Sequence, residues 1–438
     1  METDNTTLAD LSILNIEDDF SVFNKLNFCQ TAGGKQKLLQ NFCTPLKSIQ
    51  QIQGVQQTLQ LIIQQHPHWP PQISNGSVMV IEKFYLATID EIPENPSAMG
   101  ALAYKLLHGP DFSFVKYSAE HAFDFIKGMQ QMLQYFLLPQ SPEPLKKILE
   151  SAQAILNKPQ FDIVTQYPKS VAMPINKQLA LAHFLRYRYR QNMIDLLDIY
   201  YRLDAWYGMA MAVKNFNLVF PSFTAQQKPL LQVKGLYHPL LQQPVAYDVV
   251  LNPDKNFLFL TGANMAGKST FIKSVGTAVF MAHIGMGVPA QQMQLSVFDG
   301  LLSNINVMDN IVKGESYFFN EVQRIKATVQ KIADKRNWLI LIDELFKGTN
   351  VQDAMKCSSA VIEGFLKITN SAFIVSTHLY EIGEPLRQHS NIIFNYFETG
   401  VHNDQLQFNY QLKDGISNDR LGYLILKNEG VVDMLQKL

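Results

Sequence analysis

The run Thr261-Gly-Ala-Asn-Met-Ala-Gly-Lys-Ser-Thr270 decides the fold, because residues 262–269 match the pattern G-x-x-x-x-G-K-[ST] in full. The run leaves a short apolar strand at 257–260 and enters a helical pattern that continues to residue 282. Glycines at both ends let the backbone curl so that several N–H groups face one phosphate, and the helix adds its positive end. The sequence therefore predicts a P-loop that binds ATP through Gly262, Ala263, Asn264, Met265, Ala266, Gly267, Lys268, Ser269 and Thr270.

A second apolar strand, at 338–342, ends in two acids, Asp343 and Glu344. Such an ending is a weak signal by itself, but Asp343 follows Lys268 by 75 residues, which makes it a strong one. We expect Lys268 to reach the β- and γ-phosphates, and Asp343 to bind Mg²⁺ together with the Ser269 hydroxyl. Glu344 is the expected general base that activates the attacking water.

A third apolar strand, at 372–376, is followed by Thr377 and His378. His378 is either a satisfied structural residue or a group that faces the γ-phosphate, and its place after a P-loop and an acidic strand favours the second. We therefore predict that His378 is catalytic, with Glu344 and Lys268. Strands that alternate with helical runs predict a largely parallel sheet covered on both faces. The runs 391–397 and 406–412 are expected to form a hairpin.

Length and composition are those of a globular protein of two or three domains, with 438 residues, 47% hydrophobic and 17% charged. The formal net charge of −1 supplies no overall attraction to nucleic acid or an anionic membrane. Three scattered cysteines are expected to be reduced and mostly buried. The chain shows no signal peptide and no apolar run long enough to span a membrane, which predicts a cytoplasmic location.

Two domains are expected, an all-α domain at 1–225 and an α/β domain at 226–438. In the first, helical patterns are predicted to break at Gly33-Gly34 and at the prolines between 139 and 144. A pattern from about 177 to 215, with one glycine and no proline, predicts a single long helix that leads into the second domain.

Two features of the helical part have a functional and a structural interpretation. Arg186-Tyr-Arg-Tyr-Arg190 could grip a nucleic-acid backbone, but residues two apart point to different sides of a helix. A solvated face with tyrosines packed inward is therefore favoured. His66 and His68 lie in a Pro-rich segment without a third ligand nearby, so a surface loop is favoured over a metal site.

The P-loop and the two strand endings resemble an ABC-type ATPase, and their finer pattern resembles the MutS family. The other similar stretches are Tyr237–Pro239, Gly285–Ala290, Asp309–Glu321, Asp343–Thr349, Thr377–Glu381 and Gly422-Tyr423. The resemblance covers about 228–438 closely, and the helical part resembles the core and lever of that family more loosely. It implies an α/β P-loop NTPase fold of the ABC type, with a mostly parallel sheet, preceded by an all-α core and lever domain.

The resemblance implies a shortened family member, without the mismatch-recognition and connector domains. In ABC-type sites the signature serine acts across a dimer interface, so Ser316 is expected to complete the ATP site of a partner subunit. The expected assembly is a homodimer, or a heterodimer with a larger MutS-like protein. The family pattern changes at Tyr317, at Phe346-Lys347 and at Asn350.

Three functions remain open from the sequence. An ATP-hydrolysing protein that acts on DNA in mismatch repair or recombination is favoured, and a nucleotide-switched scaffold that binds protein partners without reading mismatches is the alternative. An SMC-like or transporter ATPase is disfavoured, because the 75 residues between Lys268 and Asp343 leave no room for a coiled-coil arm. The residue that contacts adenine also remains open, with Tyr247 and Val245 as candidates.

Overall fold

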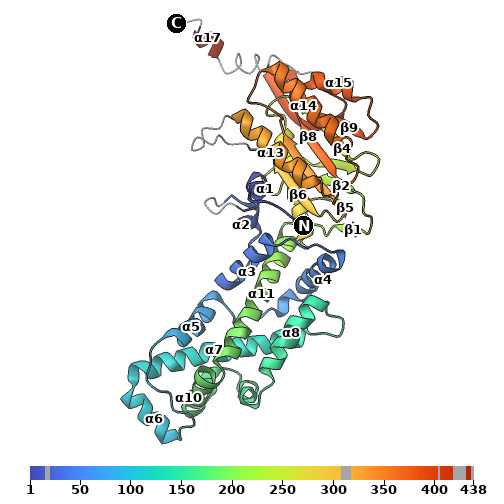
Figure 1. Cartoon of the computed structure of the whole chain (residues 1–438). Helices are drawn as coiled ribbons and strands as arrows, with labels where there is room; N and C mark the ends of the chain where they lie inside the picture. Colours follow the sequence, from blue (N-terminus) through green and yellow to red (C-terminus); the bar gives the residue numbers. More distant parts are fainter. Residues whose placement is uncertain (15–19, 307–316, 403–404, 418–430, 436–438) are drawn as a thin grey trace. The chain divides into compact units, whose positions relative to one another are not determined.

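The computed structural model describes residues 1–14, 20–306, 317–402, 405–417 and 431–435 (Figure 1). The chain divides into two compact units. The α/β unit comprises residues 1–25, 44–52 and 216–438, and the helical unit comprises residues 26–43 and 53–215. This division differs from the predicted boundary at 225/226, because the first 25 residues belong to the α/β unit.

The α/β unit is built on a six-stranded sheet of order β10-β9-β4-β8-β7-β6, in which every neighbouring pair is parallel except β10 with β9. Its strands are β4 (Phe257–Gly262), β6 (Gly300–Asn304), β7 (Trp338–Asp343), β8 (Ala372–Ser376), β9 (Ile392–His402) and β10 (Gln405–Asp414). Every residue of β4, β7 and β8 is buried, as parallel strands between two helical layers require. The predicted parallel sheet and C-terminal hairpin are confirmed.

Helices cover both faces of this sheet, and the alternation of side chains along β7 shows how. Ile340 and Ile342 belong to a core cluster that includes residues of α13 (Tyr317–Ile332) and α14 (Val351–Phe365). Leu341 points the other way, toward Gly276 of α12 (Lys268–His283), where an added Cβ would lie 2.7 Å from the leucine. Two short helices, α15 (Gly383–Leu386) and α17 (Val431–Leu435), follow in the C-terminal part.

A smaller four-stranded sheet of order β1-β5-β2-β3 completes the α/β unit. Its strands are β1 (Ser222–Thr224), β2 (Leu231–Leu236), β3 (Tyr247–Leu251) and β5 (Gln292–Ser296). The pair β2–β3 is antiparallel, and β3 begins with Tyr247. This sheet therefore brings the segment before the glycine-rich loop close to that loop, as the cavity described below shows.

The N-terminal residues are part of this unit because their polar groups pair with its edge strand. Helix α1 (Asn5–Asp10) ends at Asp10, whose carboxylate accepts hydrogen bonds from Ser303 Oγ at 2.7 Å and from the Ile305 amide at 3.0 Å. Glu2 forms a parallel bridge with Gly300 at the start of β6. Helix α2 (Val22–Leu26) follows. Nothing in the sequence of this polar segment indicated that it would extend a distant sheet.

The helical unit consists of helices that pack on the long helix α7 (Gly109–Phe136) and on α11 (Arg190–Asn215). The others are α3 (Ala32–Cys43), α4 (Ile49–Gln65), α5 (Asn75–Leu86), α6 (Ala98–Leu107), α8 (Glu143–Leu156), α9 (Asp162–Gln166) and α10 (Ile175–His183). Three 3₁₀ turns lie at His66–His68, Pro159–Phe161 and Ser170–Ala172. The predicted all-α character of this part is confirmed, and so is the break predicted at the prolines between 139 and 144, since α7 ends at Phe136 and α8 begins at Glu143.

The predicted single helix from 177 to 215 is wrong. Helix α10 ends at His183, a π turn covers Phe184–Arg188, and α11 begins at Arg190. Tyr189 causes the break: its ring is buried against Phe161 and Phe184, at centroid distances of 5.5 and 5.0 Å, and its hydroxyl donates to the Ile155 carbonyl at 2.7 Å. Burial of one aromatic ring outweighs helical continuity, which periodicity alone does not reveal.

The predicted helix break at Gly33-Gly34 lies slightly earlier in the structure: α2 ends at Leu26 and α3 begins at Ala32, so both glycines are in the first turn of α3. The glycines serve close packing instead: a Cβ on Gly34 would lie 2.0 Å from Asp204 Oδ2. The buried Asp204 carboxylate accepts hydrogen bonds from the amides of Gln30 and Thr31 at the start of α3. The cysteines are less buried than expected, with Cys43 exposed and the other two intermediate.

Candidate functional site

The glycine-rich loop, residues 262–269, joins the end of β4 to the first turn of α12. Gly262 and Gly267 have φ values of +140° and +112°, and Met265 also has a positive φ of 69°. A Cβ on Gly262 would lie 3.1 Å from the carbonyl oxygen of Phe397. Both glycines are therefore required by conformation, and the chain curls as the sequence pattern predicts.

Lys268 is the first residue of α12, and its side chain is folded back over this loop. Its ammonium donates to the carbonyl oxygens of Gly262 at 2.8 Å and Ala263 at 3.0 Å. Burial lowers the pKa of Lys268, and the nearby Glu344 and Asp343 carboxylates oppose that shift. A buried ammonium held mainly by carbonyl oxygens is a good donor for an incoming anion.

Asp343 ends β7 next to the loop, and two serine hydroxyls point at its carboxylate. Ser269 donates to Oδ2 and Ser376, the last residue of β8, donates to Oδ1. Parallel pairing of β7 with β8, with Asp343 opposite Ser376, fixes the second contact. The predicted pair Ser269 and Asp343 is thus brought together, while Ser376 was missed because a serine before Thr-His carries no distinctive spacing.

Glu344 lies at the centre of three cationic or protonatable groups. Lys347 Nζ lies 3.1 Å from Oε2, His378 Nδ1 lies 3.7 Å from Oε2, and Lys268 Nζ lies 3.8 Å from Oε1. Burial by itself would raise the pKa of Glu344, but hydrogen bonding from His378 and the charges of the two lysines lower it to about 2. In this arrangement Glu344 is ionised and held.

The strand ends explain why these side chains converge. Glu344 has a φ of 60°, a left-handed conformation directly after β7, and its amide donates to the Ser376 carbonyl at 3.0 Å. His378 follows β8 by two residues, so both predicted catalytic groups stand at the carboxyl edge of the sheet. Lys347 was noted in the sequence only as a departure from a family pattern, and its charge next to Glu344 was the missed signal.

A cavity of about 560 Å³ opens beside the loop. Predicted residues that line it are Asn264, Met265, Gly267, Lys268, Ser269, Thr270, Asp343 and Glu344. Ala266 is buried, and His378 Nδ1 lies 3.7 Å from the Glu344 carboxylate that lines the cavity. Ser316 lies outside the described residues, so the structure does not place it.

Three further residues that could contact a base line the same cavity. Val245 and Tyr247, the two candidates for the adenine contact, are both present. The Tyr247 ring is buried edge-to-face against Phe271 and Phe397, at centroid distances of 5.6 and 5.5 Å. Tyr410 of β10 also lines the cavity, is 40% exposed and has a φ of 52°. Its origin in the distant hairpin explains why the sequence did not single it out.

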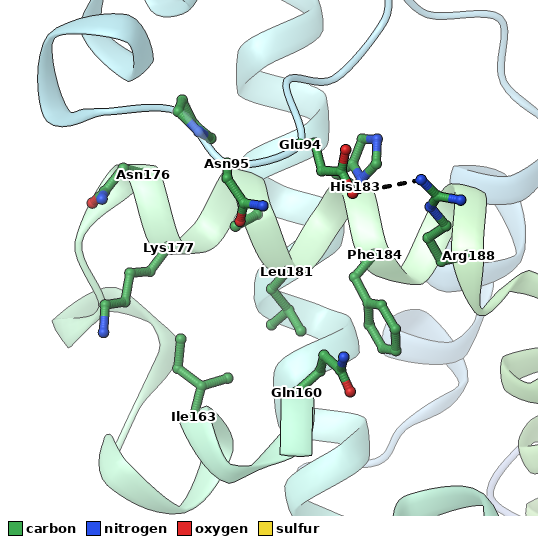
Figure 2. Close-up of a pocket in the computed structure, with 12 residues that line it drawn as sticks. Glu94, Asn95, Gln160, Ile163, Asn176, Lys177, Leu181, His183, Phe184 and Arg188 are labelled. Atoms are coloured by element: carbon green, nitrogen blue, oxygen red, sulfur yellow. Dashed lines mark ion pairs between the residues drawn. The ribbon is translucent and has the colours of Figure 1, made fainter. Parts of the chain in front are cut away.

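A second cavity, of about 480 Å³, lies in the helical unit (Figure 2). Its lining mixes apolar side chains such as Leu181 and Phe184 with polar ones. The charged residues Glu94 and Arg188 pair with each other across 3.6 Å, as the dashed line in Figure 2 shows. None of the residues that line this cavity is a glycine, so it lacks a glycine-rich loop of the kind that binds phosphate.

The residues beside the loop fit ATP and Mg²⁺. The loop has glycines where the backbone must curl, a lysine with carbonyl partners that a phosphate can replace, and a cavity within the usual range for small ligands. The Ser269 hydroxyl and the Asp343 carboxylate supply the oxygen ligands that Mg²⁺ prefers. Within the described residues, no group of three or more His, Cys, Asp or Glu side chains could hold a metal ion.

Comparison with known proteins agrees with this geometry. Residues 258–435, which contain the loop and the ends of β7 and β8, match the model of MutS domain V. This C-terminal part of the chain is a MutS domain V. MutS proteins are ATPases in general, and a mixed sheet with parallel strands and flanking helices is compatible with their domain V. None of the described helices is long and apolar enough to cross a lipid bilayer.

The curated relatives are named DNA mismatch repair protein MutS. That of Oceanobacillus iheyensis is 27% identical over 307 residues, which cover 66% of this chain and 34% of the relative. That of Thermotoga maritima is 28% identical over 250 residues, or 56% and 31%. That of Pseudothermotoga lettingae is 30% identical over 234 residues, or 52% and 28%. The chain spans about a third of the length of these MutS relatives.

Proposed function

We propose that this chain binds ATP with Mg²⁺ and hydrolyses it to ADP and phosphate. It uses this cycle of binding and hydrolysis to act on DNA in mismatch repair or recombination. The observation that supports the proposal most is the convergence of Lys268, Lys347 and His378 on Glu344, next to a loop shaped for phosphate. An ABC-type P-loop fold is part of the same proposal. The site therefore has a base, cations for the phosphates and a cradle of amides.

Each residue has a separate task in the proposed reaction. The amides of the loop and the Lys268 ammonium bind the β- and γ-phosphates, for which the ammonium exchanges its bonds to the Gly262 and Ala263 carbonyls. Ser269 and Asp343 hold Mg²⁺, with Ser376 orienting the aspartate. Bound Mg²⁺ supplies positive charge that offsets the negative charge on the phosphate oxygens.

Glu344 changes partners in this proposal. With a pKa of about 2 it is a weak base, because two lysines and His378 stabilise its charge. Phosphate oxygens compete for Lys268 and Lys347, so ATP binding weakens their hold on the carboxylate and raises its basicity. Glu344 then accepts the proton of the attacking water, and His378, whose Nδ1 lies 3.7 Å from Oε2, stays beside the same carboxylate.

DNA is the proposed partner because the curated relatives carry that function in their names. A nucleotide-switched scaffold that binds a protein is the alternative, and the formal net charge of −1 favours it, since phosphate backbones attract basic surfaces. Both proposals share the ATP site. They also share the proposed homodimer, or heterodimer with a larger MutS-like protein, in which Ser316 acts on the partner subunit.

The deciding experiment measures ATP binding and phosphate release by the full chain, with Mg²⁺ or EDTA and with duplex, mismatched or branched DNA. We expect Mg²⁺-dependent turnover that DNA accelerates. Turnover without acceleration by any DNA would favour the scaffold, whereas no retention of ATP at millimolar Mg²⁺ would refute both. Sedimentation with a non-hydrolysable ATP analogue tests the dimer, and a strict monomer in every nucleotide state would contradict it.

A further inference from the structure

Glu321, on helix α13 (Tyr317–Ile332), is a buried acid whose carboxylate holds a loop of the candidate ATP site. Its Oε1 accepts a hydrogen bond from the Lys347 amide at 3.2 Å, and its Oε2 accepts one from the Gly348 amide at 3.3 Å. Burial raises the pKa of Glu321, although these two amides oppose the shift. Both oxygens of one buried side chain therefore bind two successive backbone amides.

The loop that Glu321 holds has a strained backbone. Glu344 and Phe346 have φ values of 60° and 59°, a left-handed conformation that is costly for residues other than glycine. Such residues persist where their surroundings hold them in place. The ring of Phe346 is buried and lies against Phe318 of α13, at a centroid distance of 5.7 Å. We call residues 344–348 the Glu344 loop, and α13 is one of the elements that hold it.

Helix α13 also approaches the Glu344 loop too closely for a side chain at position 348. A Cβ on Gly348 would lie 2.7 Å from the Tyr317 ring and 2.8 Å from the Phe318 amide nitrogen. Backbone atoms cannot move aside as the end of a flexible side chain can, so even alanine would push the loop away from α13.

The Glu344 loop carries two charged groups of the candidate ATP site. Lys347 Nζ lies 3.1 Å from Glu344 Oε2, and both side chains line the cavity beside the glycine-rich loop, whereas Glu321 does not line it. In the proposed reaction the Lys347 ammonium passes from the Glu344 carboxylate to a phosphate oxygen, so its backbone has to stand within reach of both. Glu321 anchors that backbone at the lysine itself.

We propose that Glu321 is a positioning residue for ATP hydrolysis: it holds the amides of Lys347 and Gly348 so that the Lys347 ammonium stays beside Glu344. A carboxylate suits this task because it offers two acceptor oxygens and no donor when ionised. The inference rests on the proposed role of Glu344 as general base. It adds that the rate depends on a residue of α13 outside the cavity.

The first test compares Glu321→Gln with Thr328→Val in the full chain. Glutamine keeps the shape of the side chain but turns an N–H group toward one of the two amides. Thr328 is also buried on α13, but its hydroxyl bonds to the Arg324 carbonyl at 3.0 Å and to Asn304 Nδ2 at 3.3 Å. We expect Glu321→Gln to lower kcat at least about fivefold with an unchanged KM for ATP, because small misplacements of reacting groups slow the chemical step. Thr328→Val should leave both constants unchanged.

A double-mutant cycle with Lys347→Ala separates positioning from folding. If Glu321 acts through Lys347, Glu321→Gln should cause little further loss of kcat once the lysine has been removed. An equal loss in both backgrounds would mean that Glu321 acts through stability, and it would overturn the proposal. A normal kcat in Glu321→Gln, or a change in KM alone, would overturn it as well.

Gly348→Ala disturbs the same contact from the side of the loop, and it keeps the proposal testable if Glu321→Gln does not fold. Gly364→Ala, on the exposed side of α14, is its control, because a Cβ there meets nothing within 4 Å. Gly348→Ala should lower kcat with an unchanged KM, and Gly364→Ala should change neither.

Hydrogen exchange tests the hold on the loop without any turnover. Amides of residues 345–349 should exchange faster in Glu321→Gln and Gly348→Ala than in the wild-type chain, and at the wild-type rate in Thr328→Val and Gly364→Ala. Unchanged exchange in the first two variants would overturn the proposal. Faster exchange in a chain that never hydrolyses ATP would instead refute the proposed function, so the two failures are distinguishable.

Discussion

The sequences of the two units differ in how clearly they indicate a functional site. In the α/β unit, side chains with chemistry stand at the ends of buried strands, so that Asp343, Glu344 and His378 meet because parallel strands end at one edge. In the helical unit, polar side chains mostly pair with neighbours, as Glu94 does with Arg188. Spacing in the sequence therefore indicates a site in the first unit and only a helix in the second.

The two cavities express the same contrast. The cavity beside the glycine-rich loop gathers Lys268 from the start of α12 and Asp343 and Glu344 from the end of β7. The cavity in the helical unit is of similar size and is lined by one acid, Glu94, and two bases, Lys177 and Arg188, but none of its lining residues is a glycine. Neither size nor net charge distinguishes a functional site; the curled loop and the groups that converge on Glu344 do.

The largest expected difference between the two cavities concerns ATP binding after one lysine is removed from each. Lys268→Ala should abolish ATP binding up to millimolar nucleotide, because no other buried ammonium lines the loop among the described residues. Lys177→Ala, in the cavity of the helical unit, should leave binding unchanged. Binding is measured with a fluorescent ATP analogue; a loss in the Lys177 variant, or none in the Lys268 variant, would contradict the assignment.

Glu344→Gln tests the hydrolysis of ATP, the step that follows binding. The amide cannot accept a proton from water, so kcat should fall by a factor of at least about 100 while ATP still binds. Glu363→Gln, an exposed position on α14, is the control and should keep full turnover. Phosphate release and equilibrium binding are measured on the same samples. Normal turnover in the Glu344 variant would remove this residue from the role of general base.

Much of the α/β unit was predictable because its elements are short, apolar and separated by turns with defined chemistry. Phe257–Gly262, Trp338–Asp343 and Ala372–Ser376 were readable as buried strands, and parallel pairing followed from their order. The contacts that could not be predicted join residues that lie far apart along the chain. Tyr410 enters the cavity from a hairpin, and Asp10 pairs with an edge strand some 290 residues later, at a separation of 293 from Ser303.

The helical unit was less predictable for a physical reason. Helical periodicity gives the face of a helix but not its partner, and single packing events then decide where helices end. Tyr189 breaks the helix predicted from 177 to 215, whereas Gly33 and Gly34 do not break α3, since both allow close approach of α11 side chains. Neither outcome follows from local propensity.

Acidification should change the free energy of unfolding of the two units in opposite directions at the two groups described here, His283 and Asp204. Burial lowers the pKa of the fully buried His283 to about 4, with a smaller contribution from the N-terminal amine. The unfolded chain binds this proton below pH 6.5, so the stabilising contribution is complete above 6.5 and is lost as the pH falls to 4. The expected loss is on the order of 3 kcal/mol in the α/β unit.

Asp204 in the helical unit shifts the other way, because burial raises its pKa more than the hydrogen bonds from Thr31 and Gln30 lower it. Its folded form binds a proton before the unfolded form does, so acid relieves a penalty there. Urea unfolding followed by Trp338 for the α/β unit and by Trp69 and Trp206 for the helical unit measures both. His283→Gln should flatten the acid slope at Trp338 alone; equal slopes at both probes would contradict the assignment.

The smallest expected effect comes from a matched pair of helix caps, one in each unit. Asn350 accepts a hydrogen bond from the Asp353 amide at 3.0 Å at the start of α14, and Ser74 accepts one from the Ser77 amide at 3.2 Å at the start of α5. Each change to alanine leaves one helical N–H without its side-chain acceptor and should cost about 1 kcal/mol in the free energy of unfolding.

Function should distinguish these two caps even though their stability costs are alike. Asn350 follows the loop that carries Lys347, whose ammonium lies 3.1 Å from Glu344, so fraying of α14 loosens the chain that positions this lysine. Asn350→Ala should therefore lower kcat several-fold with little change in KM, and Ser74→Ala should leave both unchanged. Asn350→Ser, a good cap with a different side chain, should restore the rate. A rate that follows stability equally in both alanine variants would mean that the caps act only through folding, and the proposed difference between the two units would then not extend to their helix termini.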